Sequence, residues 1–428
     1  MPIAMIVALF AALAIGIPVS ISIALAAILG IKIFTNMPLL VAAQQLYVNL
    51  DSFPLIAIPL FILAGNIMEA GGVSTRLVDI AKVIVGRGTG GLAAACVVAC
   101  MIFGSVSGSS VATTFAVGSI LIPALVKQGY PRPFAAALQA TSAEMAVILP
   151  PSIPMILFGV STGTSIGALF VAGILPAIIM AVGLVALVYI WSSIRGWGKN
   201  PAEAEDDLSI IRAIRAGVPA LLMPVIIVGG IYGGIFTPSE SAVVAVFYAL
   251  LVGGLVYREI TFTKLVQAFE KSAAATGFIL LTLGAAGLFT FLINRTGAPA
   301  AMVEWMTTVF HASWTFLIAT NIFLFVIGMF IETAAAILVL APLLLPVAVS
   351  LGIDPVHFGM IMTVNMALGM VTPPIGVNLF AACTVAKEPI EKVAPALVPF
   401  ILVALGTIIL ITYVPAVSLW LPSLLSGN

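Results

Sequence analysis

Two segments of this chain combine small polar residues with residues that break helices. The first, Phe103 to Thr114, reads FGSVSGSSVATT, and its hydroxyl groups and accessible backbone can offer neutral oxygen ligands to a cation. The second, Ile148 to Pro154, reads ILPPSIP and cannot continue a regular helix, because proline lacks an N–H and clashes with the preceding turn. Neither segment contains an acidic residue, so both suit Na⁺ better than Ca²⁺ or Mg²⁺, which prefer carboxylates.

These segments lie in an unusually apolar chain. Hydrophobic residues make up 62% of the 428 residues and charged residues only 7%, whereas soluble domains have about 45–50% and 25%. We therefore predict an all-α, polytopic integral membrane protein. The formal net charge of zero gives no indication of a nucleic-acid partner. Three cysteines without CxxC spacing and only two histidines indicate core residues rather than a metal centre.

The run from Gly88 to Val126 contains no charged residue. This run is too long for one membrane helix, which needs about 20 residues, and short for two helices with a loop. Irregular backbone at membrane depth is tolerated only where it is buried in protein or lines a cavity. The run therefore predicts a re-entrant hairpin, at about residues 91–126, whose polar tip binds a ligand.

The two halves of the chain match one another at a nearly constant offset in sequence. The pairs that carry this match are Gly71 with Gly297, Gly104 with Gly328, Pro123 with Pro346, and Pro150-Pro151 with Pro373-Pro374. Each half thus supplies a hairpin tip followed by a Pro-Pro break. Broken segments at matching places in two halves are typical of a transporter with its site near the bilayer midplane.

The repeat predicts the following organisation. Residues 1–53 form an N-terminal membrane helix, kinked near Gly16-Ile17-Pro18, and an interfacial helix; 54–194 form the first repeat, with the hairpin at about 91–126 and the break at 148–154; 195–217 form a polar linker; 218–386 form the second repeat, with a hairpin at about 318–350 and a break at 371–377; and 387–428 form a C-terminal helix. The N-terminal apolar run has no basic leading segment, so we expect it to stay as a membrane helix.

Several polar residues inside these apolar runs have more than one interpretation. Glu332 lies in the second hairpin, and a carboxylate at membrane depth is a functional candidate by default. It can ligate a cation or couple to a proton, and it can equally cap a half-helix. Gln139, Ser142 and Glu144 are expected to line helix contacts, since small and polar side chains serve membrane helix packing.

At these motifs the sequence resembles the large membrane subunit, DctM-type, of tripartite ATP-independent periplasmic (TRAP) transporters. The matching pieces include PLFILAGNIMEAGG, FGSVSGSSVATTFAVGSILIPALV, ILPPSIP, FTPSESAVVAV, GMFIETAAAILVLAPLLLPV and GMVTPPIGVNLF, from about Pro59 to Phe380. The resemblance implies an elevator-type secondary transporter of the bacterial inner membrane, built from inverted repeats with a scaffold and a transport domain. It also implies Na⁺ as coupling ion, no other cofactor and no enzymatic activity.

The resemblance further implies two partners and an acidic solute. A separate, small four-helix membrane subunit is expected, since nothing here precedes the first helix. A periplasmic binding protein would deliver the solute, a C4-dicarboxylate, a sialic acid or a related sugar acid. The motifs do not distinguish these solutes.

Carried over by position, the resemblance implies three groups of site residues. The first Na⁺ site takes Ser105, Ser107, Gly108, Ser109, Leu149, Pro150, Pro151 and Ser152. The second Na⁺ site takes Gly328, Glu332, Thr333, Gly369, Thr372 and Pro373. The solute site takes Ser110, Thr113, Thr114, Asn365 and Asn378.

Other functions remain as alternatives. A Na⁺/carboxylate symporter that needs no binding protein and a passive channel both fit the apolar, hairpin-containing pattern. An intramembrane serine protease would need a base within hydrogen-bond reach of a tip serine. His311 and His357 lie outside both tips, and the second tip, IGMFIETAAAIL, has no serine, which argues against a protease.

Overall fold

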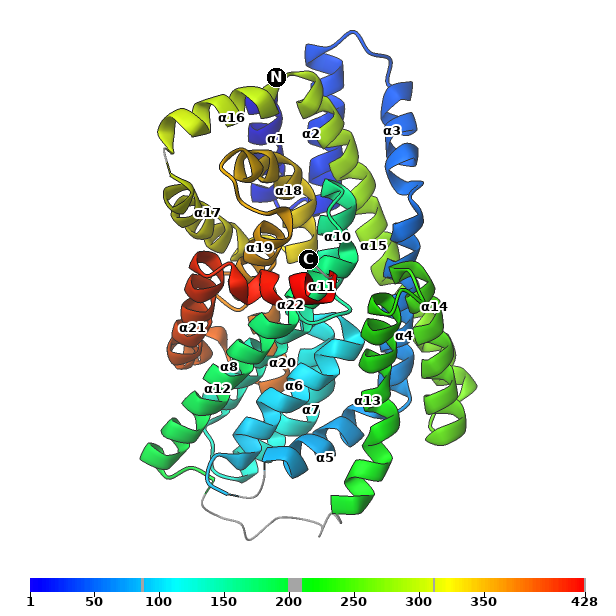
Figure 1. Cartoon of the computed structure of the whole chain (residues 1–428), viewed down its shortest axis with the longest axis vertical. Helices are drawn as coiled ribbons and strands as arrows, with labels where there is room; N and C mark the ends of the chain where they lie inside the picture. The colour runs from blue at the N-terminus through cyan, green and yellow to red at the C-terminus, as the bar shows by residue number, and fades with distance from the viewer. Residues whose placement is uncertain (86–87, 199–209, 311, 427–428) are drawn as a thin grey trace.

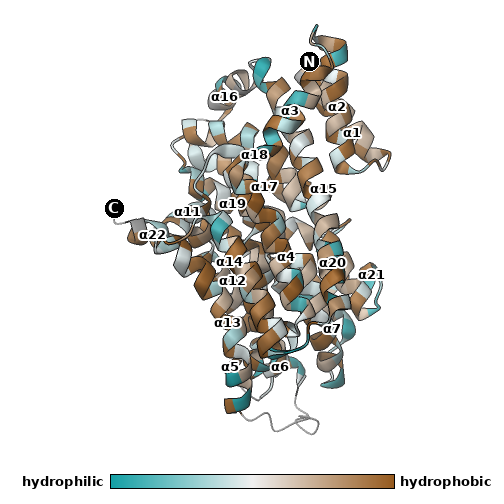
Figure 2. Ribbon diagram, turned by 90° about the vertical axis from the view of Figure 1, so that its right-hand side faces the viewer, coloured by the Kyte–Doolittle hydropathy of each residue, from teal (hydrophilic) through white to brown (hydrophobic). Residues whose placement is uncertain are grey.

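The computed structural model of the chain describes residues 1–85, 88–198, 210–310 and 312–426, and within these ranges every regular element is a helix. The predicted all-α fold is therefore confirmed. Eight of the described helices are long and apolar enough to cross a membrane, or nine if the bent pair on either side of residues 149–152 counts as one span. Figure 2 shows hydrophobic residues along most of the bundle, with hydrophilic residues most evident near α5 and α16 at its two ends.

The N-terminal run forms two helices, so the prediction of one kinked helix was wrong. α1 (Pro2–Ala14) and α2 (Val19–Phe34) pack against each other. The turn between them contains Gly16 at φ +85°, a conformation that favours glycine, followed by Pro18 at the start of α2. A side chain at Gly30 would meet the Met5 sulfur at 2.7 Å, so residues near opposite ends of the run are in contact. α3 (Leu40–Leu50) then packs along α15.

The first repeat begins with a 3₁₀ turn and continues through a series of helices. Their bounds are Phe53–Ile56 for the 3₁₀ turn, then α4 (Ala57–Ala70), α5 (Val73–Val85), α6 (Gly91–Ser107), α7 (Ser110–Lys127), α8 (Arg132–Ala143), α9 (Met145–Ile148), α10 (Ile153–Thr162), α11 (Ile166–Ala172) and α12 (Ile174–Arg195). α6 and α7 pack against each other as a hairpin that turns at residues 108–109.

Two helices follow the first repeat. α13 (Ile210–Tyr232) begins inside the predicted polar linker, 195–217, of which residues 199–209 lie outside the described residues. α14 (Pro238–Leu250) starts with a capping box in which Thr237 and Glu240 bond reciprocally, and it continues into a π-helical segment, Leu251–Val256. α4 packs against α14 and α15, and α13 packs against α14.

The predicted second repeat, 218–386, contains most of α13, all of α14 and six further helices. These are α15 (Phe262–Arg295), α16 (Ala298–Val309), α17 (Ser313–Gly328), α18 (Thr333–Ser350), α19 (Pro355–Met370) and α20 (Val377–Ala386), and they are followed by α21 (Ile390–Tyr413) and α22 (Ala416–Ser426). α15 is continuous through Lys271.

Helix boundaries follow the sequence repeat closely. The offset in residue number that matches Pro150-Pro151 with Pro373-Pro374 also matches both ends of α7 with both ends of α18. The same offset matches the first residue of α8 with the first residue of α19. The helices after the two breaks exchange partners: α10 packs against α18 of the second hairpin, whereas α20 packs against α7 and α8. Figure 1 shows α6 and α7 in the lower half of the molecule and α17 and α18 in the upper half.

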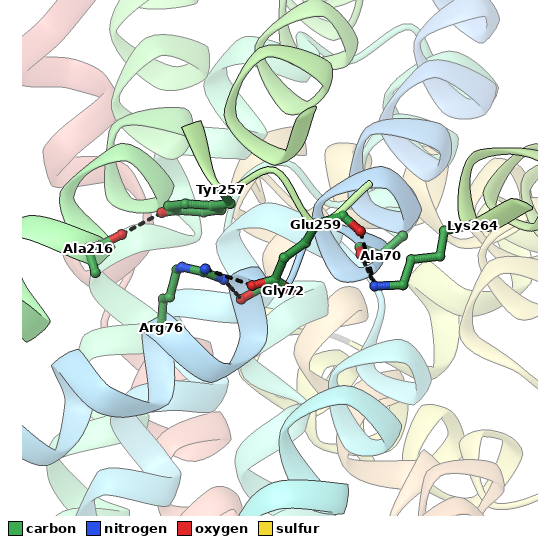
Figure 3. Close-up of polar contacts among 7 residues, drawn as sticks. All are labelled: Ala70, Gly72, Arg76, Ala216, Tyr257, Glu259 and Lys264. Atoms are coloured by element: carbon green, nitrogen blue, oxygen red, sulfur yellow. Dashed lines mark hydrogen bonds and ion pairs between the residues drawn. The ribbon is translucent and has the colours of Figure 1, made fainter. Parts of the chain in front are cut away.

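A charged cluster fixes the start of α5, the helix that leads into the first hairpin (Figure 3). Arg76 donates to the carbonyl oxygen of Gly72 (2.8 Å), pairs with Glu259 (2.7 Å) and stacks its guanidinium 3.8 Å from the Tyr257 ring centroid. Tyr257 in turn donates to the carbonyl oxygen of Ala216 on α13 (2.6 Å). Gly72 has φ +74°, and a side chain there would collide with the Glu259 carboxylate. We call these residues, Gly72, Arg76, Ala216, Tyr257 and Glu259, the α5 latch.

Candidate functional site

The first hairpin tip, residues 107–109, gathers three neutral oxygens. α6 ends at Gly108, which has φ +63°, and the Ser109 hydroxyl caps α7 by accepting from the Ala112 N–H. The Ser107 hydroxyl lies 3.0 Å from the Thr113 hydroxyl and 3.3 Å from the Ser109 carbonyl oxygen. Thr113 also donates to that carbonyl, at 2.8 Å. Hydroxyl and carbonyl oxygens in a cluster of this kind form the neutral donor set that suits Na⁺.

The first break, residues 149–152, touches this tip. A side chain at Gly108 would lie only 2.5 Å from the Pro151 carbonyl oxygen, so a glycine is needed for this approach. Ser152 caps α10 and donates to the Val147 carbonyl oxygen at 2.6 Å. Leu149 is buried, and the Pro150–Pro151 peptide bond is cis. The Ser105 hydroxyl donates to the Ile102 carbonyl oxygen on its own helix. Of the residues predicted for the first Na⁺ site, Ser105 therefore does not contribute its hydroxyl to this cluster.

The second tip, residues 329–332, meets the second break, residues 371–376, in a similar way. Gly328 and Gly369 are in backbone contact, since a side chain on Gly369 would lie 2.4 Å from the Gly328 Cα. The Gly376 N–H donates to the Met329 carbonyl oxygen at 3.3 Å, and the Pro373–Pro374 bond is cis. Thr333 donates to the Met370 sulfur (2.9 Å), whereas Thr372 donates to Leu368 on its own helix (2.8 Å).

Both tips border one cavity of about 440 Å³, a size suited to a small organic ligand. The lining on the first side comes from Ser107 to Ala112 of the first tip and the start of α10, and on the second side from Glu332 to Ala334. α4 and α15 close the opposite wall with residues that include Gly65, Asn66, Glu69, Lys271 and Phe278. The two tips and these two helices therefore share a single compartment.

Three helix N-termini converge on the cavity. Lining residues come from the first turn of α7 (Ser110, Val111, Ala112), of α10 (Ile153, Pro154) and of α18 (Thr333, Ala334). The positive end of the helix dipole and the unpaired N–H groups of a first turn favour an anion. α6, by contrast, ends at the cavity, so its last carbonyl groups present negative charge beside the first tip.

Three charged side chains line the cavity, Glu69, Lys271 and Glu332, and the sequence motifs did not predict that they lie together. Lys271 of α15 is the basic residue among the lining residues that the structure describes, and it interacts electrostatically with Glu69 of α4. Glu332, at the N-cap position of α18, makes no side-chain cap hydrogen bond and borders the cavity. Lys271 and Glu69 escaped the sequence analysis because both adjoin stretches that resemble wet connectors.

The residues predicted for the solute site are divided among four places. Ser110 borders the cavity, and Thr113 of α7 bonds to Ser107 and Ser109 of the first tip. Thr114 donates to Asn378 at 2.6 Å, and this pair is buried between α7 and α20. Asn365 bonds to Asn321 of α17 at 2.8 Å, and Asn321 bonds to Thr412 of α21. The structure thus brings only Ser110 of this group to the cavity lining.

Two further predictions concern buried polar residues and histidine. Gln139 accepts from the Cys96 thiol (3.1 Å) and donates to the Cys100 sulfur (3.2 Å), which fits the predicted role in helix packing. His357 bonds through Nδ1 to Ser418 at 2.7 Å, and so its described partner is not a tip serine. His311 lies outside the described residues.

Comparison with known proteins identifies the family. The family model for the DctM component of tripartite ATP-independent periplasmic transporters matches residues 6–417. The chain belongs to the DctM family. DctM proteins are transporter permeases, and with eight candidate spans this chain is a multi-pass membrane protein of that kind.

Several curated DctM relatives are similar over nearly the whole chain. The C4-dicarboxylate TRAP transporter large permease protein of Rhodobacter capsulatus is 39% identical over 96% of each chain. The sialic acid large permease of Vibrio cholerae is 32% identical over 96% of each chain. The isethionate permease DctMQ of Oleidesulfovibrio alaskensis is 39% identical over 95% of this chain, which spans 64% of the length of that relative.

A solved structure supports the DctM fold independently. The YdaH transporter of Alcanivorax borkumensis, whose crystal structure is described as having an unusual topology, aligns with a TM-score of 0.64. The alignment covers 86% of this chain and 87% of YdaH at 17% sequence identity. At that identity the likeness concerns the fold alone.

Proposed function

We propose that this DctM protein is the large permease subunit of a secondary active TRAP transporter that takes up an acidic organic solute with Na⁺. The solute lies in the 440 Å³ cavity between the two hairpin tips and the α4 and α15 wall. The relatives named above are transporters of C4-dicarboxylates, sialic acid and isethionate, and a further one is named for 2,3-diketo-L-gulonate. These names describe organic anions, which supports the same solute class here.

One observation carries this proposal: the first turns of α7, α10 and α18 and the Lys271 ammonium meet at one cavity. A carboxylate in that position gains from N–H donors, helix dipoles and a fixed positive charge. Ser110 and Thr333 add hydroxyl donors at two of these helix starts. Glu69 and Glu332 border the same space and disfavour an anion, so the solute carboxylate is expected nearer Lys271 and the α7 start.

Sodium is proposed to bind beside the first tip. Three oxygens already lie within 3.3 Å of one another there, namely the Ser107 hydroxyl, the Thr113 hydroxyl and the Ser109 carbonyl. The Pro151 carbonyl faces Gly108 beside them. A Na⁺ ion there would lie near the negative end of α6. The second site is proposed between residues 328–333 and 369–373, where Gly328 and Gly369 bring two backbones into contact and Glu332 offers a carboxylate.

An elevator mechanism is proposed for the movement of solute. In it the hairpins and the helices that move with them pass α4, α14 and α15, of which α4 packs on the other two. Gly65 of α4 supports this proposal, because a side chain there would lie 3.2 Å from the Ser107 Cα, so the moving surfaces pass at backbone distance. We propose a periplasmic binding protein and a small membrane subunit as partners in the bacterial inner membrane.

Reconstituted uptake tests the proposal. The chain and its small subunit are placed in liposomes, and uptake of labelled succinate and sialic acid is measured with and without the cognate binding protein. The expected result is saturable uptake that requires an inward Na⁺ gradient and stops when choline replaces Na⁺. Uptake that does not saturate, or that ignores the binding protein, would favour the channel or the simple symporter.

A further inference from the structure

Glu144 is a buried carboxyl that the transport proposal leaves without a task. It follows α8, is fully buried, and lies where α7 and α20 pack against α8. Its Oε1 accepts a hydrogen bond from the Asn378 amide at 2.8 Å. Its Oε2 has no hydrogen-bond partner among the described residues, and no described basic side chain forms an ion pair with it.

The hydrogen bonds of Asn378 determine which carboxyl oxygen can carry a proton. The Asn378 Nδ2 lies 2.9 Å from the Ala140 carbonyl oxygen, which can only accept, so the amide orientation is fixed. Thr114 then donates to the Asn378 Oδ1, and the second Nδ2 hydrogen points at Glu144 Oε1. Oε1 is therefore an acceptor, and a proton on the carboxyl must be on Oε2.

Burial without a cation favours the neutral form of this carboxyl. An ionised carboxylate in an apolar interior loses its hydration, and only a partner charge or several hydrogen bonds can compensate. Glu144 has one such hydrogen bond and lies within the apolar helix pair Arg132–Ile148 and Ile153–Thr162. A proton on Oε2 removes the charge and supplies a donor that is otherwise missing.

The equivalent place in the second half of the chain shows that this network is not needed for packing. In the register that superimposes α7 on α18, Glu144 corresponds to Ala367 and Thr114 to Ile337, and both of these are buried. α10 packs against α18 there, as α20 packs against α7 here. The polar network is therefore an addition in one half, at the cost of burying a carboxyl.

The Ser110 side chain connects Glu144 with the cavity. Ser110 interacts electrostatically with the carboxyl without a hydrogen bond to Oε2, and the same residue lines the cavity at the start of α7, the helix that packs against α8. We propose that Glu144 is a proton-binding site of the transport domain, protonated on Oε2, which exchanges its proton with cavity water through the Ser110 hydroxyl. In this exchange the Ser110 hydroxyl accepts the Oε2 proton and passes its own proton to a cavity water, and the reverse relay returns a proton from water to Oε2, so that the carboxyl ends neutral.

Other titratable groups on the neighbouring helices do not take this role. On α6, Cys96 and Cys100 contact Gln139 rather than Glu144. The others near this bundle lie toward helix ends, for example Lys127 of α7, Arg195 of α12, His357 of α19 and Cys383 of α20. None of them acts on the Glu144 carboxyl, and Glu69, Lys271 and Glu332 lie at the cavity itself.

Infrared spectroscopy of the purified full chain in lipid nanodiscs tests the assignment with D₂O as the probe. We expect a carboxylic C=O stretching band that is absent in Glu144→Gln, and that shifts when the wild type is transferred to D₂O. Glu69→Gln is the matched control and should keep the band. Identical carboxyl bands in wild type and Glu144→Gln would overturn the protonated state, and a band that never shifts in D₂O would overturn the exchange.

A second variant keeps the test valid if Glu144→Gln does not fold. Asn378→Ala leaves Glu144 intact and removes the donor to Oε1, so the C=O band should move to higher frequency; no movement would overturn the network. The inference rests on the proposed function only for its place in a transport cycle. Because the spectra need no solute, a failure of uptake would count against the proposed function and would leave this assignment standing.

Discussion

At the scale of single residues, the proposed binding of an acidic solute depends on Lys271, the basic side chain among the described cavity-lining residues. Two acidic side chains, Glu69 and Glu332, border the same space, so an anion binds only where the ammonium and the helix starts outweigh them. The proposal for an acidic solute therefore depends on one cation more than on the hydroxyl-rich tip.

Replacing Lys271 by Met is expected to raise the apparent KM for the acidic solute by about tenfold or more, because a charge-assisted contact contributes about 1.5–3 kcal/mol. Uptake by proteoliposomes measures this change. Lys264→Met is the control: Lys264 borders the adjoining smaller cavity with Lys271 but donates to the carbonyl oxygens of Glu259 and Ala70. Equal effects of the two substitutions would contradict a specific role for Lys271.

Removing the tip hydroxyls should affect Na⁺ rather than solute. Ser107→Ala combined with Thr113→Val removes two of the three clustered oxygens, and the Na⁺ concentration for half-maximal uptake should rise about three- to tenfold, at about 0.5–1.5 kcal/mol for the lost contacts. Ser119→Ala, which removes a hydroxyl that bonds within α7, is the control. An unchanged Na⁺ dependence in the double variant would remove the first cation site.

The residue scale also shows what the sequence could not predict. Ser107, Gly108 and Ser109 were found because a polar, glycine-containing cluster is anomalous in an apolar run. Lys271 and Glu69 look like ordinary connector charges in sequence, and only the packing of α15 on α4 brings them to the cavity. Asn365 is a polar residue in an apolar run too, yet it bonds to Asn321, so polarity alone did not indicate its partner.

At the scale of elements, backbone-breaking residues gave the most reliable signals. Both hairpin turns and both Pro-Pro breaks lie where glycine and proline interrupt apolar runs, because these residues act locally. The pairing of α1 with α2 was missed, since Gly16 and Pro18 are equally compatible with a kink or a turn. Which of the two occurs depends on contacts such as Met5 with Gly30, distant in sequence.

The α5 latch makes a prediction about stability. Arg76→Met removes an ion pair, a hydrogen bond and a cation–π contact, and it should destabilise the protein by about 1–2 kcal/mol, a modest loss because the pair is partly exposed. Burial raises the pKa of the nearby Asp79 carboxyl, and the charges of Lys82 and Arg76 partly offset this. Thermal unfolding in detergent measures the loss.

Lys82→Met is the matched control for the latch. It removes the longer 3.8 Å contact with Asp79 on the same helix and should change stability less than Arg76→Met does. Glu259→Gln should reproduce part of the Arg76→Met effect, because it removes the charge but keeps an acceptor for the guanidinium. A Glu259→Gln variant as stable as the wild type would show that the stacking on Tyr257, rather than the ion pair, fixes α5.

At the scale of the whole molecule, the repeat yields two similar hairpins with different chemistry. Each tip touches its own break, and each helix after a break packs on the other hairpin, so the two halves interlock. In the proposed elevator, such an interlocked unit would move past α4 and α15 as one body. The cavity lies at this boundary, which connects solute binding with the proposed movement.

A cross-link across that boundary tests the movement. Gly65→Cys with Ser107→Cys places two thiols where a side chain at Gly65 lies 3.2 Å from the Ser107 Cα, and oxidation should stop uptake because α4 and the first tip can no longer separate. Gly71→Cys with Gly253→Cys is the control pair. A side chain at Gly71, after α4, would lie 2.9 Å from the Gly253 Cα in the π-helical segment after α14, so this link joins two segments on the same side of the proposed boundary. Oxidation of this second pair should leave uptake unchanged.

Uptake by each double-cysteine variant is measured before and after reduction of its disulfide. The difference between the two measurements reports the cross-link and not the substitutions themselves. Uptake by the Gly65 and Ser107 pair should return on reduction, even if Ser107→Cys weakens Na⁺ binding. The native Cys96, Cys100 and Cys383 are buried and should not compete for oxidation. Full uptake by the oxidised Gly65–Ser107 pair would contradict an elevator, since a solute that crosses while the tip stays bound to α4 needs only a local gate.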